Sequence, residues 1–107
     1  VEGNKNNNGA TAVNSIAIGP DAKSSAVNGV SLGNNATSNF SNSTAIGFAT
    51  HANGGNATAV GTNAKAVTNS TALGSNTDAK DFAVAIGHMQ ALQRVLVLML
   101  LIFMVLQ

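Results

Sequence analysis

A short hydrophobic pattern recurs along most of the chain. Each copy ends in glycine and alternates larger aliphatic or threonine side chains with alanine or serine. The six copies are Ile16-Ala-Ile-Gly19, Val30-Ser-Leu-Gly33, Thr44-Ala-Ile-Gly47, Thr58-Ala-Val-Gly61, Thr71-Ala-Leu-Gly74 and Val84-Ala-Ile-Gly87. Because side chains along a β-strand point alternately to opposite faces, this period of two predicts a short strand in every copy.

The spacing of the copies predicts a solenoid. The closing glycines are separated by 14, 14, 14, 13 and 13 residues, and such a nearly fixed period is typical of stacked structural units. Each unit has room for a second, weaker strand, which we expect within segments such as 22–27 and 64–67, where small and polar residues alternate. Strands this short cannot pair usefully within one unit, so we expect parallel pairing between successive coils. The predicted fold is all-β, a parallel β-roll of 13- to 14-residue coils.

The larger side chains of the pattern are predicted to form an internal ladder, and the small ones to form the opposite, outer face. The predicted core residues are Ile16, Ile18, Val30, Leu32, Ile46, Val60, Leu73, Val84 and Ile86. A core with two such side chains per coil is narrow, and small solitary cores are marginally stable. We therefore expect the chain to associate with copies of itself.

Asparagine recurs five residues before the closing glycine. The column consists of Asn14, Asn28, Asn42, Asn56 and Asn69, and Phe82 interrupts it in the last copy. Asparagine suits turn conformations and bonds readily to nearby backbone, so a structural ladder is the expected role of this column. Lys23 and Lys65 also occupy equivalent places, four residues after their glycines, and are interpreted as solvated turn residues.

The composition favours a binding or structural role for the chain. Charged residues make up 8% of the chain and the formal net charge is +1, so the sequence offers no basic stripe for nucleic acid. There is no cysteine, and the two histidines and four acidic residues form no pair at ligand or acid–base spacing. We expect no catalytic residues, no metal site and no cofactor.

The copies resemble the head repeats of trimeric autotransporter adhesins, or YadA-like heads, whose signature is approximately Asn-Ser-Val-Ala-Ile-Gly. The best-fitting copies are Asn14-Ser-Ile-Ala-Ile-Gly-Pro-Asp-Ala22, Asn42-Ser-Thr-Ala-Ile-Gly47 and Asn69-Ser-Thr-Ala-Leu-Gly74. The resemblance implies a left-handed roll and a homotrimer. It also implies display on a bacterial cell surface, with membrane contact only through an outer-membrane anchor domain outside this sequence.

The resemblance further implies an adhesin that binds host extracellular matrix protein such as collagen through a repetitive, rigid face. The candidate ligand-binding residues are Asn14, Ser15, Ala17, Asn42, Ser43, Ala45, Asn69, Ser70 and Ala72. Two alternatives stay open. The repeats could form a structural spacer of a surface fibre, or an ice-binding solenoid, for which Thr44, Thr58 and Thr71 align in successive coils but form an interrupted file.

The chain divides into an N-terminal flank, 1–9, the head repeats, 10–87, and an apolar tail, 88–107. Twelve consecutive apolar residues, 95–106, do not continue the repeat. A twelve-residue helix is about 18 Å long, short of a bilayer core of about 30 Å. Three alternatives for the tail stay open. It could be a helix that bundles with those of two other chains, a membrane segment that extends across Arg94, or a non-native tail.

Overall fold

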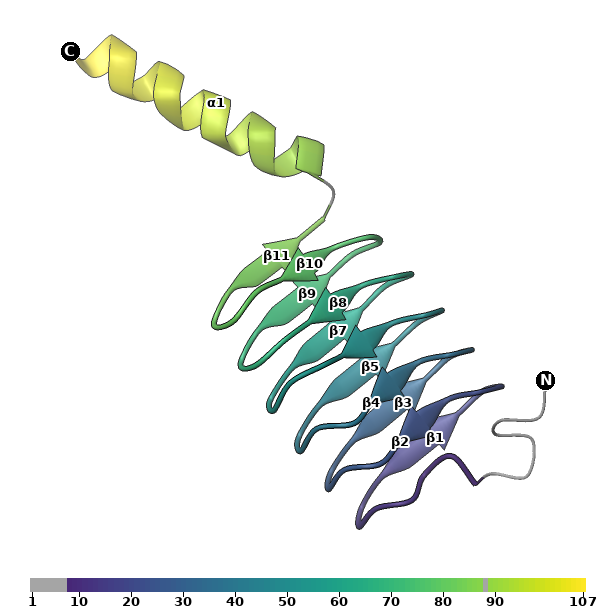
Figure 1. Cartoon of the computed structure of the whole chain (residues 1–107). Helices are drawn as coiled ribbons and strands as arrows, with labels where there is room; N and C mark the ends of the chain where they lie inside the picture. Colours follow the sequence, from purple (N-terminus) through teal and green to yellow (C-terminus); the bar gives the residue numbers. More distant parts are fainter. Residues whose placement is uncertain (1–7, 88) are drawn as a thin grey trace.

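The computed structural model describes residues 8–87 and 89–107, with the side chains of all but 89–95. Residues 1–7 of the predicted N-terminal flank and residue 88 of the predicted tail lie outside the described residues. Strands stack in two columns along the solenoid, and helix α1 follows beyond the last strand (Figure 1). The longer strands are β1 (Ile16–Ile18), β3 (Val30–Leu32), β5 (Thr44–Ile46), β7 (Thr58–Val60), β9 (Thr71–Leu73) and β11 (Val84–Ile86). The shorter strands are β2 (Lys23–Ser24), β4 (Thr37–Ser38), β6 (His51–Ala52), β8 (Lys65–Ala66) and β10 (Asp78–Ala79).

The two strand types form two separate parallel sheets. The long-strand sheet has the order β1-β3-β5-β7-β9-β11, and the short-strand sheet has the order β10-β8-β6-β4-β2. Neighbouring strands pair without slippage, so that Ala45 lies opposite Ala59 and Ala59 opposite Ala72. Equivalent residues of successive coils therefore stack in straight rows. The predicted parallel β-solenoid, including its weaker second strand in each coil, is confirmed.

Each coil reverses direction through two β-turns. In the coil that contains β8, the Ala64 N–H donates to Gly61 O at 3.2 Å before the strand, and the Ser70 N–H donates to Val67 O at 3.1 Å after it. The third residue of each turn has a positive φ, 60° at Asn63 and 54° at Asn69. Asparagine tolerates this left-handed conformation better than other residues with a Cβ, which explains why it recurs at both ends of the coil.

The change from 14 to 13 residues per coil has a local cause. After β6, Asn53 separates the strand from a turn closed between Gly54 and Ala57. After β8, the turn begins at once, with Val67 accepting from Ser70. One residue is thus lost between the short strand and its turn, and the paired rows of both sheets keep their register.

The prediction of the core is wrong, because the small side chains of the strands point inward and the predicted core residues point outward. Ala45, Ala59 and Ala72 are 0% exposed, whereas Ile16 is 48% and Ile18 56% exposed. Of the other predicted core residues, Val30, Ile46 and Val60 are half-buried. Leu32, Leu73, Val84 and Ile86 are exposed. Because the side-chain period is two, choosing the wrong face moves every residue of a strand to the other side.

The narrow coil explains why alanine and serine fill the interior. Four-residue turns join the two sheets, and the largest fully buried side chain between them is Thr50. The buried serine hydroxyls find partners inside. Ser31 Oγ donates to Lys23 O at 2.6 Å, the hydroxyls of Ser31 and Ser38 share a hydrogen bond of 2.7 Å, and Ser38 Oγ donates to Ser24 Oγ at 3.1 Å. Buried polar groups normally require such partners, so serine can replace alanine here without penalty.

The closing glycines of the pattern are required by backbone geometry and by close stacking. Gly33 has a φ of 132°, and a Cβ there would lie 2.5 Å from Gly47 O in the next coil. A side chain would therefore be strained by the conformation and would also collide with the neighbouring backbone.

The tail is helical, as α1 (Met89–Leu106). The side chains described along the helix, residues 96–106, are all exposed, with values from 52% at Ile102 to 83% at Val105. Within the described residues, no helical segment has both the length and the hydropathy needed to cross a bilayer.

Candidate binding surfaces

The outer face of the long-strand sheet is an apolar surface. Successive coils present two outward positions each, and these carry aliphatic or threonine side chains in straight rows. The rows are Ile16, Val30, Thr44, Thr58, Thr71 and Val84, and Ile18, Leu32, Ile46, Val60, Leu73 and Ile86. We name these rows the apolar face. Contiguous exposed apolar surface of this kind usually marks an interface.

The asparagine column forms a continuous hydrogen-bonded ladder along one edge of the solenoid, which we name the asparagine ladder. Each Nδ2 donates to Oδ1 of the next member, at 3.2 Å from Asn14 to Asn28 and 2.9 Å from Asn28 to Asn42. The ladder continues at 3.2 Å from Asn42 to Asn56 and 2.9 Å from Asn56 to Asn69. All five side chains are exposed. The first four amides each donate one N–H to the ladder, so their second N–H points away from that bond, and Asn69 only accepts.

The predicted ligand-binding residues divide between the surface and the interior. Asn14, Asn42 and Asn69 are exposed members of the asparagine ladder. Ala17, Ala45 and Ala72 are buried inside the coil, and so are Ser43 and Ser70, while Ser15 is half-buried. The buried residues cannot contact a ligand, because the small side chains of the strands fill the interior. That part of the predicted site is wrong.

The serines of the motif have a structural role in the turns. Ser15 Oγ donates to Ala12 O at 2.7 Å, and Ser70 Oγ donates to Val67 O at 2.6 Å. Each hydroxyl thereby closes the turn that carries an asparagine at its third position. The Asn-Ser pair of the repeat is thus explained by one turn, with the amide outside and the hydroxyl inside.

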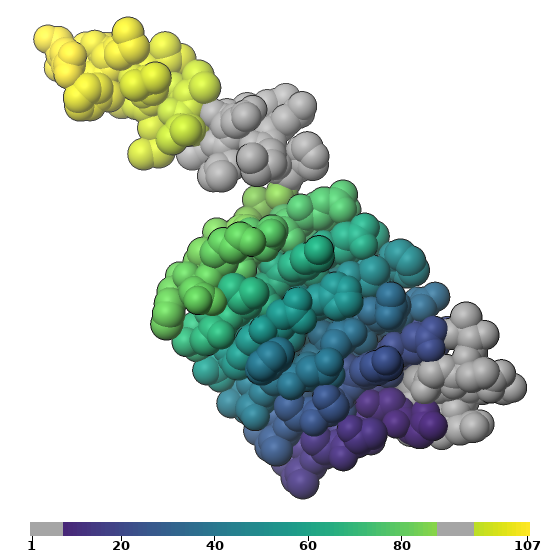
Figure 2. Space-filling view, in the orientation of Figure 1, coloured from purple at the N-terminus to yellow at the C-terminus, as the bar shows by residue number. Residues whose placement is uncertain are grey.

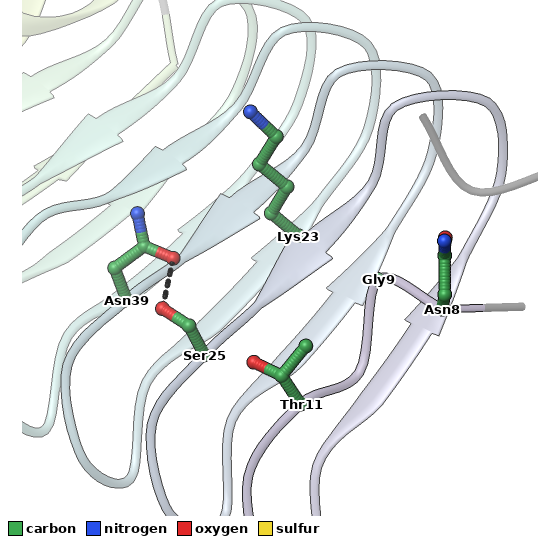
Figure 3. A pocket seen from close by; sticks show the side chains of 6 residues that line it. All are labelled: Asn8, Gly9, Thr11, Lys23, Ser25 and Asn39. Atoms are coloured by element: carbon green, nitrogen blue, oxygen red, sulfur yellow. Dashed lines mark hydrogen bonds between the residues drawn. The ribbon is translucent and has the colours of Figure 1, made fainter. Parts of the chain in front are cut away.

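The outer face of the short-strand sheet is polar and includes residues that the sequence interpretation placed in turns. Lys23 and Lys65 lie on strands β2 and β8, and both are exposed. Figure 3 shows a shallow hollow beside Lys23, where the Ser25 hydroxyl donates to Asn39 Oδ1 at 2.7 Å. The hollow has a volume of about 310 Å³ and is also lined by Asn8, Gly9 and Thr11.

A second hollow lies on the same sheet, three strands further along. It has a volume of about 360 Å³ and is lined by Asn63, Lys65, Asn76, Thr77 and Asp78. Asp78 also forms an ion pair with Lys80, with Nζ and Oδ2 3.0 Å apart. Both hollows therefore combine one lysine with side-chain amides and hydroxyls, and the second also contains the Asp78 carboxylate; such groups bind polar ligands without covalent chemistry.

The stacked coils appear in Figure 2 as continuous ridges across the solenoid. Among the residues that the structure describes, no three histidine or acidic side chains gather where they could hold a metal ion. The ordered features of the described surface include the repeated rows of the apolar face and the asparagine ladder.

Comparison with known proteins gives a family for the chain. A family model for the YadA head domain repeat matches in two copies, over residues 10–36 and 41–66. No significant match is found among curated proteins or among solved structures. The matched residues contain strands of both sheets, β1 to β3 in the first copy and β5 to β8 in the second. The chain belongs to the YadA-like heads of trimeric autotransporter adhesins, which are adhesin heads and not a family of enzymes.

Proposed function

We propose that this chain is a bacterial surface adhesin head that binds an extended host matrix protein, collagen or a related fibrous ligand, along the asparagine ladder. The observation that supports this proposal is the regularity of the ladder. Five exposed amides follow one another at the spacing of parallel strands, about 4.8 Å. A long repetitive ligand can meet such an array through many weak contacts at once, so that binding strength comes from multivalency.

The ladder is rigid before any ligand arrives. The side-chain amides are bonded to one another, and the backbone of each asparagine after Asn14 is held in its turn by a hydrogen bond to the preceding coil, such as Asn42 N–H to Val27 O at 3.0 Å. Fewer side-chain rotamers have to be immobilised on binding, which lowers the entropic cost of association. The second N–H of each amide is the group that we expect to donate to carbonyl oxygens of the ligand.

We propose further that the head is a homotrimer assembled through the apolar face. Aliphatic side chains such as Ile18 and Leu73 are 56% and 44% exposed in the single chain. Burial of a large aliphatic side chain contributes about 1.5–3 kcal/mol, so burial of whole rows of these side chains between chains would strongly favour association. Three chains that meet at this face would leave the asparagine ladders and the short-strand sheets accessible at the outside.

Binding of the full chain to immobilised triple-helical collagen tests the ligand. The variant Asn42→Gly/Asn56→Gly removes two ladder amides, and glycine accepts the φ values of 60° and 58° found there. We expect the dissociation constant to rise about tenfold or more, because two adjacent contacts are lost. Heat-unfolded collagen and an unrelated matrix protein serve as comparison ligands.

The opposite edge of the solenoid offers a matched control. Asn35 and Asn63 also occupy third positions of turns, with φ values of 61° and 60°, but lie outside the ladder. Asn35→Gly/Asn63→Gly should bind collagen as the unchanged chain does. A folded protein that binds none of the matrix ligands would instead support the spacer, and equal loss in both double variants would contradict a role of the ladder in binding.

A further inference from the structure

The short-strand sheet brings together two lysines and a histidine that are far apart in the sequence. Lys23 pairs with Thr37, Thr37 with His51 and His51 with Lys65, in the register of strands β2, β4, β6 and β8. In a parallel sheet without slippage, equivalent positions point to the same side. These four residues, which we name the basic row, therefore lie along one line on the outer face of the sheet.

The basic row has a defined spacing, and one carboxylate, that of Asp78, lies next to its Lys65 end. At about 4.8 Å between strands, Lys23 and His51 are about 10 Å apart along the row, and His51 and Lys65 about 5 Å. Among the described residues, neither lysine of the row has an ion-pair partner. The next residue in line, Asp78, is engaged by Lys80 at 3.0 Å.

The surroundings of the basic row are suited to a carbohydrate. Side-chain amides and hydroxyls line the hollow at each end, with Ser25 and Asn39 beside Lys23, and Asn63 and Asn76 beside Lys65. Such groups exchange hydrogen bonds with sugar hydroxyls. The row and the two hollows contain no phenylalanine, tyrosine or tryptophan, and the imidazole of His51 is the one ring among these residues on which a nucleic-acid base could stack.

We propose that the basic row binds a linear sulfated polysaccharide that lies along the solenoid axis. Sulfate groups would lie against Lys23, His51 and Lys65, and the amides of the two hollows would contact the sugar rings between them. Each charge contact at an exposed surface is weak and is screened by salt. Affinity therefore depends on engaging several positions of the row with one chain.

The test measures binding of the full chain to immobilised heparin, with fully desulfated, N-acetylated heparin, which keeps its uronate carboxylates but has no sulfate, as the comparison. Lys23→Gln/Lys65→Gln removes both lysine charges of the row while keeping polar side chains of similar length. We expect binding about fivefold to tenfold weaker than that of the unchanged chain, and a shallower dependence on sodium chloride. Desulfated heparin should bind the unchanged chain and the variant no more tightly than heparin binds the variant.

Asp78→Asn/Lys80→Gln is the matched control, since it removes a lysine that directly follows β10 together with the carboxylate paired with it, and leaves the net charge unchanged. It should bind heparin within about twofold of the unchanged chain. Thr37→Lys fills the gap in the row and should strengthen binding, so the test does not depend on loss alone. Unchanged heparin binding in Lys23→Gln/Lys65→Gln, or no gain in Thr37→Lys, would overturn the proposal.

Two further measurements distinguish this proposal from nucleic-acid binding and from the proposed binding of collagen. A single-stranded oligothymidine that binds as tightly as heparin, at equal charge, would overturn the preference for a sulfated polysaccharide. Collagen binding by Lys23→Gln/Lys65→Gln should equal that of the unchanged chain, because the asparagine ladder is intact in this variant. Failure of the heparin test with collagen binding preserved would therefore leave the proposed adhesin function standing.

Discussion

The two sheets of the solenoid share one interior but have opposite outer surfaces. The long-strand sheet exposes aliphatic side chains such as Ile18 and Leu32, whereas the short-strand sheet exposes Lys23 and Lys65 at its equivalent outward positions. Inside, both sheets contribute alanine and serine. The difference shows that the larger aliphatic side chains of the repeats face outward, while the coil itself is held together by small side chains and backbone hydrogen bonds.

The largest effect should follow from placing charge on the apolar face. Leu32→Asp/Ile46→Asp puts two carboxylates per chain on adjacent strands of the long-strand sheet. If the face is buried between chains, the cost is roughly 3–6 kcal/mol for the lost burial alone, and assembly should fail. Light scattering should then give the 10.7 kDa mass of one chain in place of three times that value. Thr37→Asp, on the polar sheet, should leave the oligomer intact; a trimer that tolerates both variants would assemble through another surface.

The next largest effect should come from the interior. Ala59 is 0% exposed, and leucine at this position would have to enter a space that holds nothing larger than threonine. Overpacking of this kind costs about 1–3 kcal/mol, and more where the backbone cannot shift. Urea unfolding of Ala59→Leu measures the cost. Thr58→Leu, one residue earlier on β7, points outward and should change the free energy of unfolding by less than about 1 kcal/mol; equal costs would contradict the observed facing.

A smaller, favourable effect is expected at one turn. Ala49 has a φ of 55°, whereas the equivalent turn residues Asn35 and Asn63 are asparagines. The left-handed conformation costs a residue with a Cβ about 1–2 kcal/mol, and asparagine relieves part of this cost by local hydrogen bonding. Ala49→Asn should therefore raise the free energy of unfolding by about 1 kcal/mol. Thermal unfolding would detect the shift, and a lowered midpoint would show that the turn tolerates alanine without strain.

The smallest effect on stability should come from the polar sheet. Lys65 is exposed and has no ion-pair partner among the described residues, so Lys65→Gln should alter the free energy of unfolding by less than about 0.5 kcal/mol. Urea unfolding beside the unchanged chain provides the measurement. A loss comparable to that of Ala59→Leu would mean that the lysine stabilises the coil, and the contrast between the two outer faces would no longer hold.

Much of the fold could be predicted because it depends on local preferences. The alternation around Ala45 and Ala59 located the strands, and the glycine spacing established the coil length. The asparagine ladder was also expected, since its members suit turns and stack at one position per coil. The candidate site was predicted only in part. Its asparagines are exposed, but its alanines and two of its three serines are buried.

The basic row was missed as a surface although the equivalence of Lys23 and Lys65 was visible in the sequence. The glycine-based count placed both lysines in turns, and His51, which also stands four residues after a closing glycine, was not compared with them. Strand pairing through Thr37 puts all of them in one line. The row could have been found in the sequence by comparing the residues that stand four positions after each closing glycine.

The sequence by itself determined where the chain extends and where it turns, because alternation, glycine and asparagine act through backbone conformation within a few residues. It also determined that the coils stack, since the period is nearly constant. Only the tertiary structure decided which face is inside. That choice depends on the separation of two sheets joined by four-residue turns, and this separation admits Ala59 and Ser31 but leaves Ile18 outside. Size, and not hydrophobicity, selects the interior, and the aliphatic rows remain at the surface of the chain.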